Sequence, residues 1–287
     1  MTTNTTPTFT PATNFQGTNG QAVGITYDTT YPAFGLSVYK NYDSYHQRDM
    51  YLNEHITDAV EMCCGAHYYS QGIYTTQYRK AEVTVNLNET TVVTNNVRAA
   101  FISLGVVGDY GSCDMGLKNS GNGWFSFFYC PKTKVGGNGN VISGATKVKM
   151  MLETSRANNK DVMKISYTWY NSSGTQISAS GNNASLTYSL AANSIFGAVS
   201  GIPMHRFTRF MSLVPLGQYN VQNDCDDQTK LLGGNFKNTK LYLTNGSSVT
   251  WGTSLMDYIW TVQGWNISNF SPGNNDTFSC THSNYVY

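Results

Sequence analysis

The sequence of 287 residues has few charged side chains, and this scarcity excludes several classes of protein. Asp, Glu, Lys and Arg make up 12% of the chain, about half of the roughly 25% that is usual. The 18 basic and 17 acidic side chains leave a net charge of +1. Lys and Arg form no long run, and a nucleic-acid partner, which needs a basic face, is therefore not expected. A disordered chain needs a high net charge and few aromatic residues, and this chain has neither property.

Long apolar segments and a secretory leader are missing as well. No stretch of about 18 apolar residues occurs, so the sequence predicts no transmembrane helix. The first ten residues, MTTNTTPTFT, have neither a basic n-region nor an apolar h-region, which predicts that there is no signal peptide. From the composition we expect an extracellular or surface-exposed location. Without a signal peptide, the sequence is then that of a mature form, or the protein is exported by another route or released by lysis.

Asn, Thr, Ser and Gly occupy the positions that charges usually take, and 20 tyrosines contribute to an aromatic content of 13%. Amides and hydroxyls match the hydrogen-bonding capacity of sugar hydroxyls, and Tyr and Trp offer ring faces for stacking. The composition therefore favours a partner that is either a glycan or another copy of the chain. The alternative is an ordinary solvated exterior of a β-protein.

Short apolar runs recur between turn signals from about residue 33 onward, and they predict an all-β sandwich. The expected strands are 34–39, 82–87, 99–107, 124–129, 147–153, 162–169, 207–214, 240–243 and 258–262. Clusters of Asn, Gly, Ser and Asp predict turns at 118–123, 136–140, 171–174 and 274–277, because these residues tolerate turn conformations. Residue 99 begins the longest apolar run, which predicts a central strand.

The chain shows no composition shift and no internal repeat, so we expect one domain. Residues 1–20 are rich in Thr, Asn, Pro and Gly, which predicts a flexible or extended arm before a sandwich domain over 21–287. Residues 53–65 fit a short helix, and a strand is the alternative. The fold class is therefore an antiparallel sandwich with long loops and at most one or two short helices.

The six cysteines lie at positions 63, 64, 113, 130, 225 and 280. Six cysteines allow fifteen connectivities, so the sequence leaves the pairing open. Cys113 and Cys130 flank a glycine-rich turn and are candidates for a disulfide across a hairpin.

The densest acidic cluster is VQNDCDDQT, which contains Asp224, Asp226 and Asp227. Clustered oxygen ligands on a loop suit calcium, so these three residues are the candidate metal ligands. The alternative is a polar turn, and no other cofactor is expected.

Glutamate is scarce, with only five in the chain. Glu82 and Glu153 lie on expected strands, and Glu61 is a third candidate for the two carboxylates that cleavage of a polysaccharide requires. The alternative for each is a solvent-facing residue, which is what an isolated glutamate on an amphipathic strand usually is.

A candidate sugar-binding site consists of Trp124, Asn122, Asp114 and Arg209. Trp124 follows a glycine-rich turn, where a tryptophan can form a platform for a sugar or pack under the hairpin. Arg209 lies among aromatic residues, where it can bind a ligand or form a structural ion pair.

Three passages resemble the concanavalin A-like jelly roll, the superfamily of legume-type lectins and β-glucanases. Residues 112–129 resemble a hairpin, 147–177 a long hairpin with a second turn, and 232–243 a late edge strand. The resemblance implies a jelly-roll sandwich and a lectin-like role. The paired glutamates of the glucanases are absent, and only residues 223–227 hint at the lectin metal ligands.

These observations favour a non-catalytic, lectin-like carbohydrate-binding protein whose copies act together. The first alternative is a self-assembling structural protein of a fibre, coat, capsid or crystalline layer, which a low charge and an extended arm suit. The second alternative is a polysaccharide-cleaving enzyme that uses Glu82 or Glu153.

Overall fold

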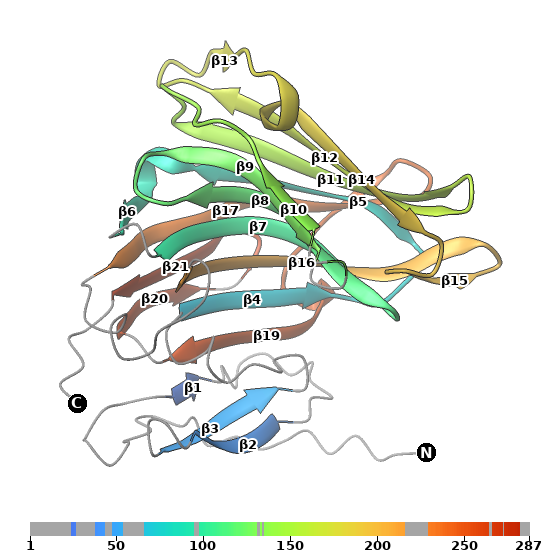
Figure 1. The fold of residues 1–287 in the computed structure, drawn as a ribbon, viewed down its shortest axis with the longest axis horizontal. Helices are drawn as coiled ribbons and strands as arrows, with labels where there is room; N and C mark the ends of the chain where they lie inside the picture. Colours follow the sequence, from blue (N-terminus) through green and yellow to red (C-terminus); the bar gives the residue numbers. More distant parts are fainter. Residues whose placement is uncertain are drawn as a thin grey trace.

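The computed structural model describes residues 24–26, 38–43, 48–53, 66–94, 98–130, 133, 135–215, 229–263, 266–271 and 273–281. Two large antiparallel sheets face each other across one hydrophobic core (Figure 1). The expected β-sandwich is thus confirmed. In these ranges the helical structure is limited to three short 3-10 turns, η1 (Leu87–Glu89), η2 (Gly181–Asn183) and η3 (Thr253–Leu255). No helix of the described part is long and apolar enough to cross a bilayer.

Sheet I contains nine strands, with β15 (Gly197–Val199) paired alongside β16. The other strands follow the order β1 (Gly24–Thr26), β19 (Met256–Gln263), β4 (Ala66–Gly72), β16 (Ile202–Pro215), β7 (Arg98–Gly108), β8 (Gly111–Asn119), β9 (Trp124–Cys130) and β10 (Val135–Asn138). The run at 99–107 forms most of β7 and occupies the middle of this sheet, as predicted.

Sheet II contains ten strands. Its main path is β13 (Gln176–Ile177), β12 (Lys160–Tyr170), β11 (Lys147–Ala157), β5 (Tyr78–Asn86), β17 (Lys230–Leu243), β21 (Asp276–Thr281) and β20 (Asn266–Ser271). Beside this path, β14 (Ser185–Ala191) pairs with β12, and β6 (Thr91–Val93) and β18 (Ser248–Thr250) pair with β17. A separate hairpin joins β2 (Val38–Asp43) to β3 (Arg48–Asn53).

Alternation along the strands determines which face is buried. In β12, Met163, Ile165, Tyr167 and Trp169 are buried, whereas the residues between them are partly or fully exposed. The same period of two governs β11, which joins β12 through a turn whose Asn158 and Asn159 have φ values of 50° and 56°. Asparagine tolerates this left-handed conformation, which a two-residue hairpin requires.

Two predictions about local structure were wrong, and tertiary pairing explains both. Residues 136–138 were expected in a turn, but they form β10 because they pair with Phe127–Tyr129 of β9. Residues 232–243 were expected at a sheet edge, but β17 lies between β5 and β21. The arm at 1–20 and residues 54–65 lie outside the described residues.

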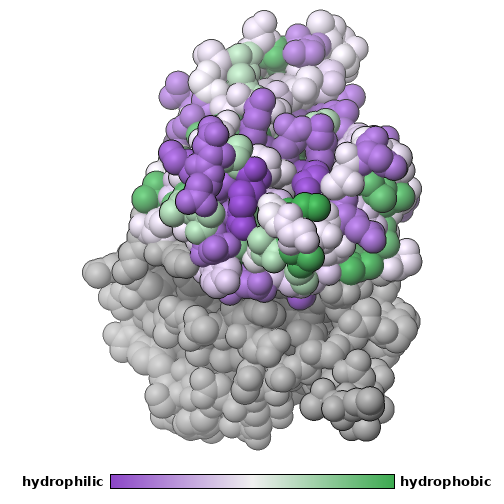
Figure 2. All heavy atoms as spheres, turned by 90° about the vertical axis from the view of Figure 1, so that its right-hand side faces the viewer, coloured by the Kyte–Doolittle hydropathy of each residue, from purple (hydrophilic) through white to green (hydrophobic). Residues whose placement is uncertain are grey.

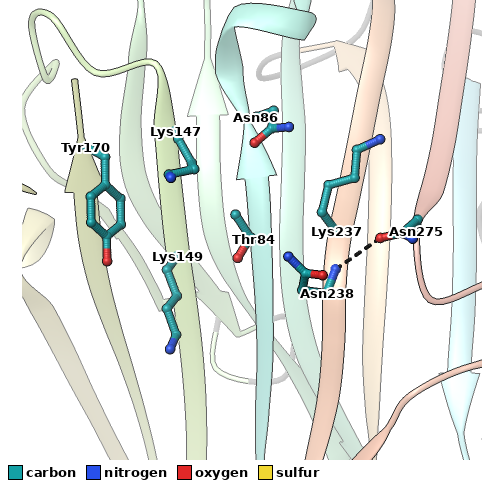
Figure 3. Close-up of a pocket in the computed structure, with 8 residues that line it drawn as sticks. All are labelled: Thr84, Asn86, Lys147, Lys149, Tyr170, Lys237, Asn238 and Asn275. Carbon is teal, nitrogen blue, oxygen red and sulfur yellow. Dashed lines mark hydrogen bonds between the residues drawn. The ribbon is translucent and has the colours of Figure 1, made fainter. Parts of the chain in front are cut away.

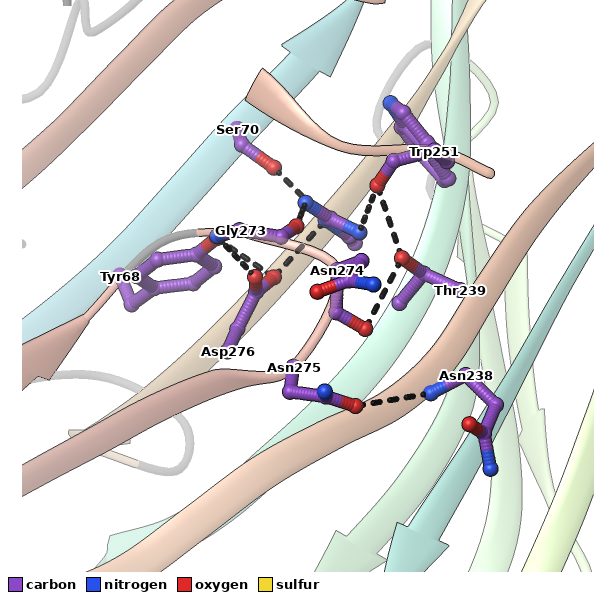
Figure 4. A network of polar contacts seen from close by, with 10 residues as sticks. Tyr68, Ser70, Asn238, Thr239, Trp251, Gly273, Asn274, Asn275 and Asp276 are labelled. Carbon is purple, nitrogen blue, oxygen red and sulfur yellow. Dashed lines mark hydrogen bonds and ion pairs between the residues drawn. The ribbon is translucent and has the colours of Figure 1, made fainter. Parts of the chain in front are cut away.

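A buried ion pair joins the two sheets at the end of β21 (Figure 4). Arg209 of β16 and Asp276 of β21 are both fully buried, and the Arg209 Nε lies 2.9 Å from Asp276 Oδ2. The Tyr68 hydroxyl donates to the same oxygen at 2.6 Å. Burial raises the pKa of the Asp276 carboxyl, and Arg209, Tyr68 and the Gly273 amide oppose that rise. The alternative that Arg209 forms a structural ion pair is therefore the one that the structure shows.

The ion pair also fixes the turn between β20 and β21. Arg209 Nη2 donates to the Gly273 carbonyl at 2.6 Å, and the Gly273 amide donates to Asp276 Oδ1 at 2.6 Å. Arg209 Nη1 donates to the Trp251 carbonyl at 3.1 Å, and the Thr239 hydroxyl donates to the same carbonyl at 2.8 Å. These bonds connect β16, β17 and the turn.

We expect Asp276→Asn to lower the free energy of unfolding by about 3–5 kcal/mol, because it leaves the buried Arg209 without its counter-charge. The control is Glu153→Gln, which breaks the partly exposed Lys80–Glu153 pair (2.5 Å) and should cost less than about 1 kcal/mol. Urea unfolding of the full chain measures both values. Equal costs for the two variants would contradict the role of the buried pair.

Candidate functional site

The outer face of sheet II, which points away from the core, carries a polar hollow of about 550 Å³ (Figure 3). Its lining combines ammonium, amide and hydroxyl groups with one aromatic ring. The lining residues are Thr84, Asn86, Lys147, Lys149, Tyr170, Lys237, Asn238 and Asn275. They come from β5, β11, β12 and β17 and from the turn before β21.

Strand register places these side chains next to one another. Asn86 of β5 pairs with Lys147 of β11, and Lys147 pairs with Tyr170 of β12, so the three form one row across the sheet. Thr84 and Lys149 are paired in the next row on the same face. Because alternate residues of a strand share a face, the buried neighbours of these residues point into the core.

A bulge in β17 adds the third lysine to the hollow. Lys237 pairs with Thr84, and the register shifts before Lys240 pairs with Glu82. Asn238 lies in this bulge with a left-handed φ of 52°. Its backbone N–H donates a hydrogen bond to Asn275 Oδ1 at 3.2 Å. Bulges of this kind redirect side chains at the surface of a sheet.

Two glutamates at the rim partly neutralise the lysines. Lys149 Nζ lies 2.8 Å from Glu82 Oε2, and Lys237 Nζ lies 3.6 Å from Glu89 Oε2. Lys147 Nζ lies 4.7 Å from the centre of the Tyr170 ring, as a cation–π contact. The hollow can therefore bind a polar ligand that carries a small negative charge.

The structure does not bring Trp124, Asn122, Asp114 and Arg209 into one exposed site. Asn122 is exposed in the β8–β9 turn, and Trp124 after it is only 8% exposed. Asp114 lies five residues from Asn119 along β8, about 17 Å at the usual rise of a strand. Arg209 is enclosed in the core. Ligand binding by Asn122, Trp124 and Asp114 stays a prediction.

Asp114 occupies a distinctive environment on the outer face of sheet I. Its neighbour across the pair is Gly105, where a Cβ would lie 2.6 Å from Asp114 Oδ1 and 2.5 Å from Thr208 Oγ1. The absent side chain therefore leaves room for both polar groups. Burial, and next the nearby Cys130, raise the pKa of Asp114 to about 7.

The predicted Cys113–Cys130 disulfide is corrected, because the structure contains both residues as buried thiols that form no disulfide. Cys113 precedes Asp114, which pairs with Tyr129, so the two cysteines do face each other across the hairpin as expected. The hydrogen bond with Cys130, and next burial, raise the pKa of the Cys113 thiol. Such a thiol stays protonated and resists oxidation.

The calcium candidates Asp224, Asp226 and Asp227 lie outside the described residues and stay a prediction. Within the described part of the chain, no three His, Cys, Asp or Glu side chains are grouped so that they could hold a metal ion.

Glu82 and Glu153 share the outer face of sheet II. Glu82 pairs with Met151 and Lys80 with Glu153, so the two glutamates are diagonal neighbours. Sequence alternation places each on the outside of its strand, but only the pairing of β5 with β11 shows that they are neighbours. Glu61 lies outside the described residues.

The lysines of the hollow are not among the site residues predicted from the sequence. Lys147 and Lys149 alternate with buried residues in KVKMMLE, which is a detectable signal for one face of a strand. The pairing of this strand with β5 and the bulge at Asn238 are long-range features that the sequence pattern does not show.

Comparison with known proteins places the chain in no family. No family model matches, and no curated protein matches either. Among solved structures, scytalido-glutamic peptidase with a peptide-based transition state analogue is similar at 12% identity over 76% of this chain and 98% of that chain, with a TM-score of 0.45. A functionally unknown protein from Saccharomyces cerevisiae is similar at 13% identity over 51% of this chain and 74% of that chain, with a TM-score of 0.24. Neither likeness assigns a residue role to this chain.

We expect Asp114→Asn to make the free energy of unfolding less dependent on pH between about 4 and 7. The folded-state pKa of Asp114 is raised to about 7, so its contribution to stability is complete below the unfolded value of about 3.9 and is lost as the pH rises through 7. Because the side chain is only partly buried, we expect the variant to be about 2 kcal/mol more stable than the wild type at pH 8.

Urea unfolding at pH 4 and pH 8 measures this effect, and the two proteins should be equally stable at pH 4. Burial lowers the pKa of His205 to about 3, so acidification destabilises the fold through that residue. The difference between variant and wild type therefore isolates Asp114. A variant that is less stable than the wild type at pH 8 would refute this account.

Proposed function

We propose that the protein is a non-catalytic, lectin-like glycan-binding protein and that the outer face of sheet II is its binding surface. An extracellular or surface-exposed location and joint action of several copies are part of this proposal. The observation that carries it is the composition of the hollow. Three asparagines, a threonine, a tyrosine and three lysines line one open surface.

Each kind of group in the hollow has a counterpart in a saccharide. Asn and Thr side chains donate and accept hydrogen bonds, as sugar hydroxyls do. Neither the Thr84 hydroxyl nor the Asn238 side chain makes a hydrogen bond with another described residue, and both line the open hollow. The Tyr170 ring at one end offers an apolar face against which a pyranose ring can pack.

Rigid strands hold these groups in place before a ligand arrives. Thr84, Asn86, Lys147 and Lys149 lie on the regular central strands β5 and β11. The Asn238–Asn275 contact continues into the unit that Arg209 and Asp276 hold together (Figure 4). Preorganisation of this kind lowers the entropic cost of binding.

Cleavage of a polysaccharide is the alternative at the same face, since Glu82 and Glu153 are diagonal neighbours. One oxygen of each carboxylate is already engaged. Glu82 Oε2 contacts Lys149 and accepts from the Tyr242 hydroxyl at 3.0 Å, and Glu153 Oε1 contacts Lys80. A general acid has to reach the glycosidic oxygen with a proton. These contacts favour binding over cleavage.

One observation supports self-assembly, namely two exposed apolar side chains on the β15–β16 hairpin. Val199 and Ile202 are 52% and 44% exposed there. Figure 2 views the molecule from the right-hand side of Figure 1, and hydrophobic patches interrupt a mainly hydrophilic described surface. Large particles in light scattering of the dilute full chain would make this second function primary.

The test of glycan binding is a glycan array with the full chain, followed by affinity measurements on the best neutral glycan. We expect Tyr170→Ala to weaken binding by about three- to tenfold, because it removes the stacking surface. Tyr129→Ala is the matched control, since Tyr129 is 44% exposed on the other sheet.

Two results would overturn the proposal. One is an array on which no glycan binds. The other is release of reducing ends from a bound polysaccharide that Glu82→Gln or Glu153→Gln abolishes, which would establish the enzyme instead. Equal losses in Tyr170→Ala and Tyr129→Ala would place the glycan elsewhere on the molecule.

A further inference from the structure

The hollow has one ammonium group that is left for a ligand. Glu82 holds Lys149 at 2.8 Å, and Glu89 holds Lys237 at 3.6 Å. Lys147 forms no ion pair with any described residue, and its contact is with the face of the Tyr170 ring at 4.7 Å. Three lysines and two glutamates leave a surplus of one positive charge.

We infer that Lys147 binds the carboxylate of an acidic sugar unit within a longer, otherwise neutral saccharide. This inference rests on the proposed glycan-binding function and adds the chemical class of the ligand. A carboxylate that meets an ammonium group forms a charge-assisted hydrogen bond, which is about twice as strong as a neutral one. The acidic unit would then lie beside Tyr170.

The rest of the hollow accepts neutral units. From β12 to β17 the surface spans three inter-strand spacings, about 14 Å, so it extends beyond a single sugar ring. Between Lys147 and the far side lie the Thr84 hydroxyl and the amides of Asn86, Asn238 and Asn275. These groups match hydroxyls rather than further charges.

A densely charged polyanion does not fit this arrangement. A nucleic acid or a heavily sulfated chain would place an anion on nearly every unit, and some of these anions would face Glu82 and Glu89 at the rim. Like charges in contact are unfavourable. The hollow therefore selects a sparse negative charge, such as one uronic or sialic acid.

The experiment compares matched probes that differ in one charged group. The first pair is a galactose trisaccharide whose middle unit is galacturonic acid and the methyl ester of that trisaccharide, which tests one uronic acid within a neutral chain. The second pair is sialyllactose and lactose, which tests a terminal sialic acid. Titration calorimetry of the full chain measures the affinity ratio within each pair for the wild type, Lys147→Gln and Lys164→Gln.

We expect the acidic member of at least one pair to bind about tenfold more tightly than its neutral counterpart. Lys147→Gln should reduce this ratio to near one. Lys164→Gln is the control, because Lys164 is exposed on the same face but outside the hollow, and it should leave the ratio unchanged. The pair that responds identifies whether the acid is internal or terminal.

Other outcomes would overturn the inference. If both members of each pair bind equally, the ligand is neutral and glycan binding itself survives. If Lys164→Gln lowers the affinity ratio as much as Lys147→Gln, the acidic probe is attracted by the overall positive charge of the face and not by a defined subsite at Lys147. If no saccharide binds but a thymidine oligonucleotide does, both the inference and the proposed function fail. Thermal unfolding of each variant shows that the fold is intact.

Discussion

The buried ion pair between Arg209 and Asp276 is the constraint on which the arrangement of the two sheets depends. Removing two charges from water is costly, and the cost is offset only when every hydrogen-bonding group is satisfied. Arg209 and Asp276 meet this requirement by binding each other and the backbone of Gly273. The turn that they fix carries Asn275, whose side-chain oxygen accepts a hydrogen bond from the backbone N–H of Asn238. A contact in the core thus determines the wall of a surface hollow.

The sandwich also explains why the polar hollow lies on a regular sheet face instead of a loop. The inward side chains of β5 and β11 form the core, so the outward ones are available for a ligand without loss of packing. Neighbouring strands keep these groups at fixed spacings. In a chain with few charges, the two glutamates at the rim reduce three lysines to a small positive surplus.

The local pattern of the sequence predicted the strands well, because alternation reports burial directly. The runs at 147–153 and 162–169 both lie in strands of sheet II. The local pattern does not show which strands pair when they are distant in sequence. Residues 136–138 form a strand because they pair with β9, and β17 is central because it pairs with β5 and β21. The same limit applies to the site, because the hollow depends on which strands are neighbours. For Arg209 the sequence left two roles open, and the burial of its partner Asp276 decides between them.

The most direct test of the account is to map a bound acidic saccharide onto the lysines. Reductive methylation with carbon-13 keeps the lysine charge and gives each ammonium group its own NMR signal. On titration with sialyllactose or with the trisaccharide that contains one galacturonic acid, we expect the largest shift at Lys147, smaller shifts at Lys149 and Lys237, and none at Lys118, which lies on sheet I. A largest shift at Lys118 would contradict the account, because the ligand would then occupy the opposite sheet.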